Sequence, residues 1–145
     1  MERILLASKW QTPDGTILES KNTHDYVDHT DKVSGEYYFL DGGNSYVRMS
    51  SNKVKMIDRS VYSTDPISVV RQHFRRGTFD ADGGRKWVLM KNMSDSHLAA
   101  CIKQVAANDP DLILNTVVMQ YVRELAYRYD NGITVPEHDY TEADE

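Results

Sequence analysis

Short apolar runs separated by turn residues fill the first half of the chain. Segments such as Thr12-Pro-Asp-Gly15 and Asp41-Gly-Gly-Asn44 are turn signals, because Pro presets φ and Gly accepts a positive φ. The alternation between turns predicts short strands. Five segments fit: residues 2–10, 16–20, 26–27, 37–40 and 45–49. They predict an antiparallel meander in which each strand returns beside the one before it.

The pattern becomes helical at Asp65-Pro66, because Asp is a favoured N-cap and Pro a favoured first helical residue. Apolar spacing predicts a first helix through about residue 75, a second from about Ser94, and a third from Asp109-Pro110 to Asn131-Gly132. Between the first two helices we expect a loop over residues 76–84 and a strand over residues 86–90.

These elements predict an α+β fold with an N-terminal antiparallel β-sheet meander followed by a helical C-terminal half. A chain of 145 residues has the usual size of one domain and is long enough to bury a core. No internal repeat or linker interrupts it. We therefore expect a single α+β domain over residues 1–136 and an acidic, disordered tail over residues 137–145.

The net charge of −5 is concentrated at one end of the chain. Residues 137–145 hold five acids and no Lys or Arg, so residues 1–136 carry a net charge of about zero. A neutral body argues against binding to extended nucleic acid, which needs a broad basic surface. A local cationic pocket remains compatible with this balance.

The chain has neither a long apolar run nor a disulfide pair. No stretch approaches 18 apolar residues, and the N-terminal sequence lacks the pattern of a signal peptide. The single cysteine, Cys101, fits a reducing compartment. These features predict a cytoplasmic protein without membrane attachment.

No metal or catalytic signature is present. The histidines are dispersed, and His24 and His29 lie five residues apart on an expected strand, so their side chains point to opposite faces. Cys101 lies on the apolar side of the second helix, where a free cysteine usually packs as a core residue. We expect no metal ligands, no catalytic residues and no cofactor.

The Ser94-Asp-Ser-His97 segment contains catalytic residue types at an expected helix start. Ser94 as the N-cap and Asp95 beside the positive end of the helix dipole explain the cluster without chemistry. A hydrolytic role for Asp95 and His97 is the enzymatic alternative.

Cationic and aromatic residues alternate between Arg71 and Asn92. Arg76, Phe79 and Trp87 are typical of a site in which guanidinium groups bind phosphate and rings stack on bases. Asn92 offers an amide for the edge of an adenine. The structural alternative is a solvated helix end followed by core aromatics, and spacing alone does not separate the two.

The third helix carries a second set of arginines and aromatics. Tyr121, Leu125 and Arg128 share a face by i, i+4, i+7 spacing, and Arg123 and Tyr127 flank it. Such a stripe packs against a core or a partner helix. If it is exposed, it predicts helix pairing, with arginines available to a pocket at a dimer seam.

The order of several segments resembles small phage proteins, most closely the phage anti-Thoeris sponge family. The resemblance covers residues 3–133. It rests on these segments: Ile4-Leu-Leu-Ala-Ser-Lys-Trp-Gln-Thr-Pro-Asp-Gly15, His24-Asp-Tyr-Val27, Asp41-Gly-Gly-Asn-Ser-Tyr-Val-Arg48, Val61-Tyr-Ser-Thr-Asp65, Arg76-Gly-Thr-Phe-Asp80 and Met93-Ser-Asp-Ser-His97.

The resemblance implies a non-catalytic protein that sequesters a nucleotide immune signal. Members of that family bind a cyclic ADP-ribose isomer made by a bacterial TIR-domain protein, some also bind cyclic oligonucleotides, and they form dimers or larger homo-oligomers. Carried onto this sequence, the resemblance implies these ligand-binding residues: Phe79, Trp87, Asn92, Arg76, Arg123, Tyr127 and Arg128. The alternatives are a hydrolase of the same signal, or a phage protein that binds a host protein through its C-terminal helix.

Overall fold

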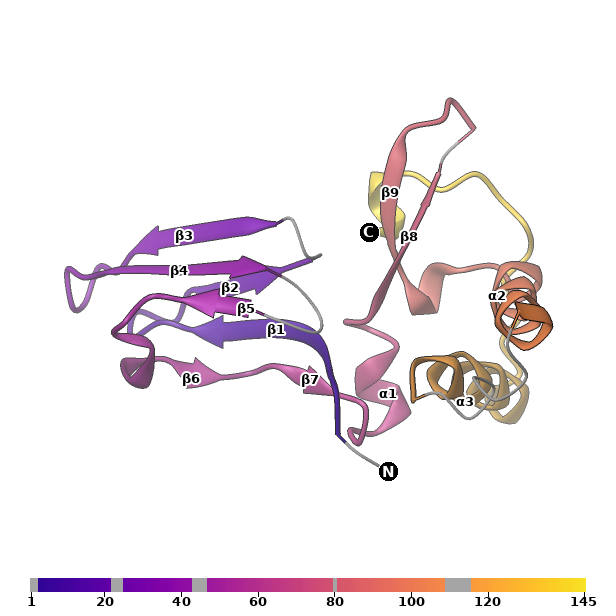
Figure 1. Ribbon diagram of the computed structural model, residues 1–145, viewed down its shortest axis with the longest axis horizontal. Coiled ribbons are helices and arrows are strands. Elements are labelled where there is room, and N and C mark those ends of the chain that lie inside the picture. The colour runs from indigo at the N-terminus through magenta and orange to yellow at the C-terminus, as the bar shows by residue number, and fades with distance from the viewer. Residues whose placement is uncertain (1–2, 22–24, 43–46, 80, 109–115) are drawn as a thin grey trace. The chain divides into compact units, whose positions relative to one another are not determined.

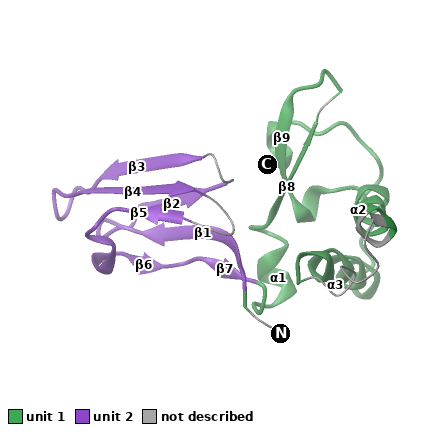
Figure 2. Cartoon of the chain, in the orientation of Figure 1, with its two compact units in different colours: residues 1–3, 63–145 green, residues 4–62 purple. Residues whose placement is uncertain are grey.

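The computed structural model describes residues 3–21, 25–42, 47–79, 81–108 and 116–145. The chain divides into two compact units, one of residues 1–3 and 63–145 and one of residues 4–62 (Figure 2). The sequence predicts a single domain over residues 1–136. Two compact units within one chain need not be separate domains, so the single domain stays a prediction.

The N-terminal unit, residues 4–62, consists of antiparallel strands (Figure 1). Its elements are β1 (Leu5–Gln11), β2 (Ile17–Ser20), β3 (Tyr26–Thr30), β4 (Tyr37–Gly42), β5 (Val47–Met49), the 3-10 turn η1 (Lys53–Lys55), β6 (Ile57–Asp58) and β7 (Val61–Tyr62). One sheet has the order β2-β1-β6, with β7 also paired to β1, and the other has the order β3-β4-β5.

The strand content of the first half confirms the predicted antiparallel character, but the meander is divided between two sheets. Leu18 of β2 and Tyr38 and Leu40 of β4 share one apolar core with Met56. Burying the inner faces of two sheets against each other is the reason that the strands do not continue as one layer. The predicted turn at residues 41–44 and the start of the fifth strand fall partly outside the described residues.

The C-terminal unit contains the helices and a β-hairpin. Its elements are α1 (Ile67–Val70), β8 (Arg75–Phe79), β9 (Arg85–Leu89), the 3-10 turn η2 (Met90–Asn92), α2 (Asp95–Asn108), α3 (Thr116–Asn131) and the 3-10 turn η4 (Glu142–Asp144). The helical second half is therefore confirmed. Phe74 and Tyr121 stack in its core with ring centroids 6.1 Å apart, and Leu98 of α2 is completely buried.

Local signals define two helix ends in the expected places. The Ser94 side-chain oxygen accepts the His97 backbone N–H at 3.2 Å, as an N-cap of α2 should. Gly132 follows α3 with φ of 64°, a conformation that glycine adopts without strain. The predicted start of the third helix at Asp109-Pro110 lies outside the described residues.

Two expectations between residues 65 and 84 are wrong. The first helix is a single turn that begins after Pro66 rather than extending to residue 75, and residues 75–79 form β8 instead of a loop. Residues 75–79 pair with β9 in antiparallel register, from Arg75 opposite Leu89 to Phe79 opposite Arg85. Few apolar residues mark β8 because much of the hairpin is exposed, so its alternation is weak in the sequence.

Candidate functional site

The β8–β9 hairpin places aromatic and cationic side chains on one surface. Gly77 pairs with Trp87, and Phe79 pairs with Arg85. Because side chains alternate along a strand and directly paired residues point the same way, these four residues share a face. The turn that joins the strands contains Asp82-Gly83-Gly84, in which Gly83 has a φ of 84°.

Arg85 lies against two aromatic rings on this face. Its guanidinium carbon is 5.5 Å from the ring centroid of Phe79 and 4.8 Å from that of Trp87. Phe79 is 63% exposed, which is unusual for a phenylalanine. Arg85 is exposed, and no ion pair of it with a carboxylate occurs among the described residues. We call these three residues the aromatic–arginine stack.

Gly77 makes room for the stack. A Cβ atom at this position would lie 2.7 Å from Arg85 Nη2 and 2.9 Å from Trp87 Cζ3. Both distances are shorter than a side chain tolerates, so only glycine allows the guanidinium and the indole to approach the β8 backbone. Arg75, Gly77 and Phe79 are spaced two apart, as residues on one face of a strand are. The expectation of a loop over residues 76–84 left this spacing unused.

Arg76 points to the other face of the hairpin. Its Nη1 donates to the Tyr121 hydroxyl at 3.3 Å, and its guanidinium carbon is 5.8 Å from the centroid of the same ring. Arg76 and Phe79 therefore do not belong to one surface. The resemblance places them in one ligand site, and the strand register separates them.

Residues 137–145, which we call the acidic segment, pack on the C-terminal unit. The Tyr140 hydroxyl accepts the Ser94 backbone N–H at 3.0 Å and lies 2.8 Å from His97 Nδ1. Burial and the charge of Arg76 lower the pKa of His97, which favours a neutral ring whose Nδ1 accepts the Tyr140 proton. The sequence predicts a disordered tail. The acidic composition of these residues favours that prediction, whereas the contacts that anchor the segment come from a single aromatic residue, Tyr140.

The acidic segment also reaches β9 and η2. The Trp87 backbone N–H donates to Glu145 Oε1 at 3.1 Å, and Asn92 Nδ2 donates to the Asp144 carbonyl at 3.0 Å. A cavity of about 190 Å³ lies under the segment. It is lined by Thr78, Ser94, His97, Glu137, His138 and Tyr140. Two of the residues expected to bind ligand, Trp87 and Asn92, are thus contacted by the chain itself.

The arginines of α3 serve the fold. Arg128 is 2% exposed, and its Nε and Nη1 donate to Glu124 Oε2 at 3.1 Å and Asp95 Oδ1 at 2.7 Å. Arg123 donates to the carbonyls of Ser63 and Asp65 at 3.1 and 2.8 Å. These contacts engage both guanidinium groups within the C-terminal unit. Helical spacing gives the face of a residue but not its partner.

Tyr127 is also engaged by a neighbour. The guanidinium carbon of Arg71 lies 4.6 Å from the centroid of its ring, and Arg71 Nε donates to Glu124 Oε1 at 2.6 Å. Of the seven residues that the resemblance implies, Phe79 and Trp87 share a surface, and Asn92 joins Trp87 through the acidic segment. Arg85, which the resemblance does not include, completes that surface.

Asp95 and His97 are bound to different partners. The Asp95 carboxylate accepts from Arg128 and from the Val135 backbone N–H at 3.3 Å, whereas His97 contacts Tyr140. Burial raises the pKa of the Cys101 thiol, which disfavours the reactive thiolate. The contacts of these side chains are those of helix capping and packing.

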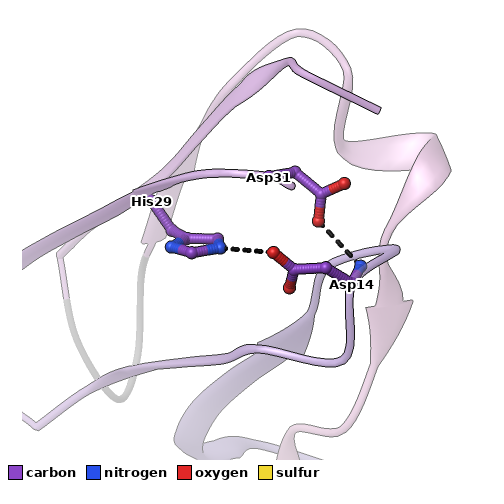
Figure 3. A group of neighbouring side chains, drawn as sticks. All are labelled: Asp14, His29 and Asp31. Atoms are coloured by element: carbon purple, nitrogen blue, oxygen red, sulfur yellow. Dashed lines mark hydrogen bonds and ion pairs between the residues drawn. The ribbon is translucent and has the colours of Figure 1, made fainter. Parts of the chain in front are cut away.

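Asp14, His29 and Asp31 gather between two turns of the N-terminal unit (Figure 3). One potential ligand atom from each lies within 4.8 Å of the others, the arrangement of a candidate metal site. The sequence pattern places His29 beside His24, which lies outside the described residues. It does not connect His29 with Asp31, two residues later, or with Asp14, which lies fifteen residues earlier along the chain.

Hydrogen bonds account for this group without an ion. Asp14 Oδ2 accepts from His29 Nε2 at 2.7 Å and from the Lys32 backbone N–H at 2.9 Å. Asp31 Oδ1 accepts the Asp14 N–H at 2.8 Å, and its Oδ2 accepts the Ser34 N–H at 2.7 Å. Donors directed at the carboxylate oxygens occupy the positions that a cation would need, so the group is better described as a link between turns.

No family model, curated protein or solved structure matches this chain. Within the described part of the chain, none of the helices has the length and apolar content needed to cross a membrane. The geometry of the C-terminal unit therefore carries the functional argument.

Proposed function

We propose that this chain binds a small phosphate-bearing nucleotide on the β8–β9 hairpin and holds it without cleaving it. The resemblance to phage sponges suggests a cyclic ADP-ribose isomer, or a cyclic oligonucleotide, as the ligand and the host cytoplasm as the place of action. In that setting the protein removes an immune signal before the effector of the defence system responds to it.

The aromatic–arginine stack is the observation that supports this proposal. A guanidinium held over aromatic rings keeps its N–H edge free for phosphate oxygens, and an exposed ring offers a face to a base. Phe79, Arg85 and Trp87 provide these features within one hairpin. Sequestration needs no general base, so a surface of this kind is sufficient for it.

Binding of cyclic ADP-ribose, measured by calorimetry, tests the proposal. We expect Phe79→Ala and Arg85→Ala each to weaken binding by about ten- to a hundredfold, since losing a stacked ring or a charge-assisted hydrogen bond costs roughly 1.5–3 kcal/mol. Tyr26→Ala and Arg48→Ala are matched controls, because both side chains are exposed in the N-terminal unit. Equal affinity of all four variants would refute the site.

The fate of the nucleotide separates sequestration from hydrolysis. Heating the complex should release the ligand with its mass unchanged, which mass spectrometry records. A hydrolysed product would favour the enzymatic alternative. If neither cyclic ADP-ribose nor a cyclic oligonucleotide binds, and the full chain captures one host protein that α3 variants release, the host-partner alternative replaces this proposal.

A further inference from the structure

The acidic segment covers polar groups that an anionic ligand would otherwise use. Glu145 places a carboxylate oxygen 3.1 Å from the Trp87 backbone nitrogen, on the side of β9 that does not pair with β8. Asp144 accepts the Asn92 amide through its carbonyl at 3.0 Å. A backbone N–H at a strand edge and a side-chain amide are both donors suited to phosphate oxygens.

A small number of contacts hold the segment in place. Tyr140 joins it to Ser94 and His97, and the His138 ring meets the Tyr140 ring edge-on at 4.9 Å. Asp144 caps the final turn by accepting the Thr141 N–H at 2.8 Å. Most of its residues are exposed. A segment with few buried contacts opens at low free-energy cost compared with the core.

Charge adds a second effect to this coverage. The segment carries five acids, and residues 139–142 line a cavity of about 370 Å³ together with Lys86 of β9. Carboxylates beside the hairpin repel a phosphate-bearing ligand and screen the cations that would attract it. A phosphate-bearing ligand that stacks on Trp87 must therefore either displace the acidic segment or bind despite the electrostatic repulsion of its carboxylates.

We infer that the acidic segment is an internal competitor that occupies the Trp87–Asn92 edge and is displaced when the phosphate-bearing ligand binds. This inference rests on the proposed nucleotide site. It gives that site a closed state, in which Glu145 and Asp144 take the donors, and an open state, in which the ligand takes them. Ligand affinity then reflects the binding energy minus the cost of opening.

Two substitutions in the full-length chain test the competition. Tyr140→Phe removes the anchoring hydroxyl without changing the charge, and Glu145→Ala removes the carboxylate on Trp87. Each should tighten binding of cyclic ADP-ribose by about two- to fivefold, the range for losing one exposed polar or ionic contact. Glu142→Ala is the matched control, because Glu142 is an exposed acid of the same segment.

The pattern of affinities identifies the cause. Tighter binding by Tyr140→Phe and Glu145→Ala, with a smaller change for Glu142→Ala, supports a positioned competitor. If Glu142→Ala and Glu145→Ala increase the affinity equally and Tyr140→Phe does not increase it, the effect comes from the net negative charge of the segment. That result would overturn the inference. Unchanged affinity in all three variants, with normal binding by the unsubstituted protein, would reject the competitor and leave the nucleotide site intact.

Hydrogen exchange supplies an independent measurement. Saturation with cyclic ADP-ribose should speed exchange of amides in residues 137–145 while slowing exchange in β9. Slower exchange in both segments would mean that the ligand closes the acidic segment over itself, which contradicts displacement. Absence of binding by the unsubstituted protein and by every variant would remove the proposed function and this inference with it.

Discussion

Arginine side chains of the C-terminal unit have different uses, and burial separates them. Arg128 and Arg71 converge on Glu124, which is completely buried, whereas Arg85 is exposed and rests on two rings. A buried carboxylate between two guanidinium groups is tolerated because each charge is paired and hydrogen-bonded. Position in the fold, rather than residue type, decides which arginines are available for a phosphate.

Arg128→Ala should destabilise the C-terminal unit instead of removing a ligand contact. It leaves Glu124 with one of its two cations, and it also ends the hydrogen bonds to the carbonyls of Met90 and Lys91. Breaking a buried pair in this way costs about 3–5 kcal/mol. Urea unfolding measures the loss, with Arg48→Ala expected to stay within about 0.5 kcal/mol of the parent protein.

Ligand binding distinguishes this role from the one implied by the resemblance. Any Arg128→Ala protein that remains folded should bind cyclic ADP-ribose as tightly as the parent protein. A stable Arg128→Ala protein that no longer binds cyclic ADP-ribose would show that Arg128 contributes to ligand binding.

Gly77→Ala should impair the stack while the hairpin persists. The new methyl group meets the Arg85 guanidinium and the Trp87 ring, which must move because a Cβ contact below 3 Å is not tolerated. Forcing an extra methyl group into a packed position costs about 1–3 kcal/mol. We expect about tenfold weaker binding of cyclic ADP-ribose and a changed near-ultraviolet circular dichroism signal from Trp87. Unaltered affinity would show that the stack does not contact the ligand.

Sequence reasoning at the residue scale located caps and rings but not partners. Ser94 was identifiable as an N-cap because its bond is local, three residues along the chain. The contacts of Arg123 and Arg128 could not be predicted, because their partners, such as Ser63 and Asp95, lie more than thirty residues away. Such pairings depend on packing between elements, which spacing within one helix does not encode.

At the scale of elements, the turn before β2 and the turn before β4 are joined by Asp14, His29 and Asp31. Hydrogen bonds from His29 and from the Lys32 backbone hold the pKa of Asp14 well below its usual range. Burial alone would raise the pKa of Asp31, but N–H donors of Ser34 and Asp14 lower it. Both carboxylates therefore favour the charged form in the folded chain.

The N-terminal unit should lose stability in acid. Because the folded pKa of Asp14 and of Asp31 lies below the unfolded value near 4, their stabilisation is present above about pH 4 and is lost as the pH falls further. Asp14→Asn should lower the urea midpoint at neutral pH, and its difference from the parent protein should shrink toward about pH 2.

Trp10 fluorescence reports this transition in a Trp87→Phe background, since the chain has two tryptophans and Trp10 packs on the core of this unit. Asp41→Asn is the control, because its partner Arg48 lies 3.9 Å away on an exposed surface. A difference that stayed constant with pH would show that Asp14 stabilises the turns by shape instead of charge.

Element prediction succeeded where a pattern was local and repeated. The strands β1 to β5 and the helix α2 followed from turn residues, alternation and an N-cap, whereas β6 and β7 were not predicted. β8 was missed because its two faces do not separate into apolar and polar residues: Arg75, Gly77 and Phe79 share one face, and Arg76 and Thr78 are polar on the other. The predicted helix also extended to residue 75, where the pairing of β8 with β9 begins, whereas α1 ends at Val70.

At the scale of the whole molecule, the chain keeps an apolar stripe on α3 that its own unit does not bury. Tyr129 is 88% exposed and Val122 38% exposed, and Ala126 lies between them at helical spacing. The opposite side of α3 packs inward through Val118, Tyr121 and the Glu124–Arg128 pair. Tyr127 and Arg123, which flank the face expected to pair with a second helix, contact Arg71 and the Asp65 carbonyl within the unit.

We expect this stripe to form the contact of a dimer at micromolar concentration. Exposed apolar residues in register on a helix favour pairing with the same surface of a second copy, because a twofold contact requires a self-complementary patch. Tyr129→Glu places a charge at the centre of the contact and should shift the mass measured by light scattering from dimer to monomer. Tyr26→Glu, on the N-terminal unit, should leave the mass unchanged. If the parent protein is a monomer throughout the micromolar range, the stripe has another partner. The nucleotide surface of β8 and β9 then functions within a single chain, because Phe79, Arg85 and Trp87 all come from one hairpin.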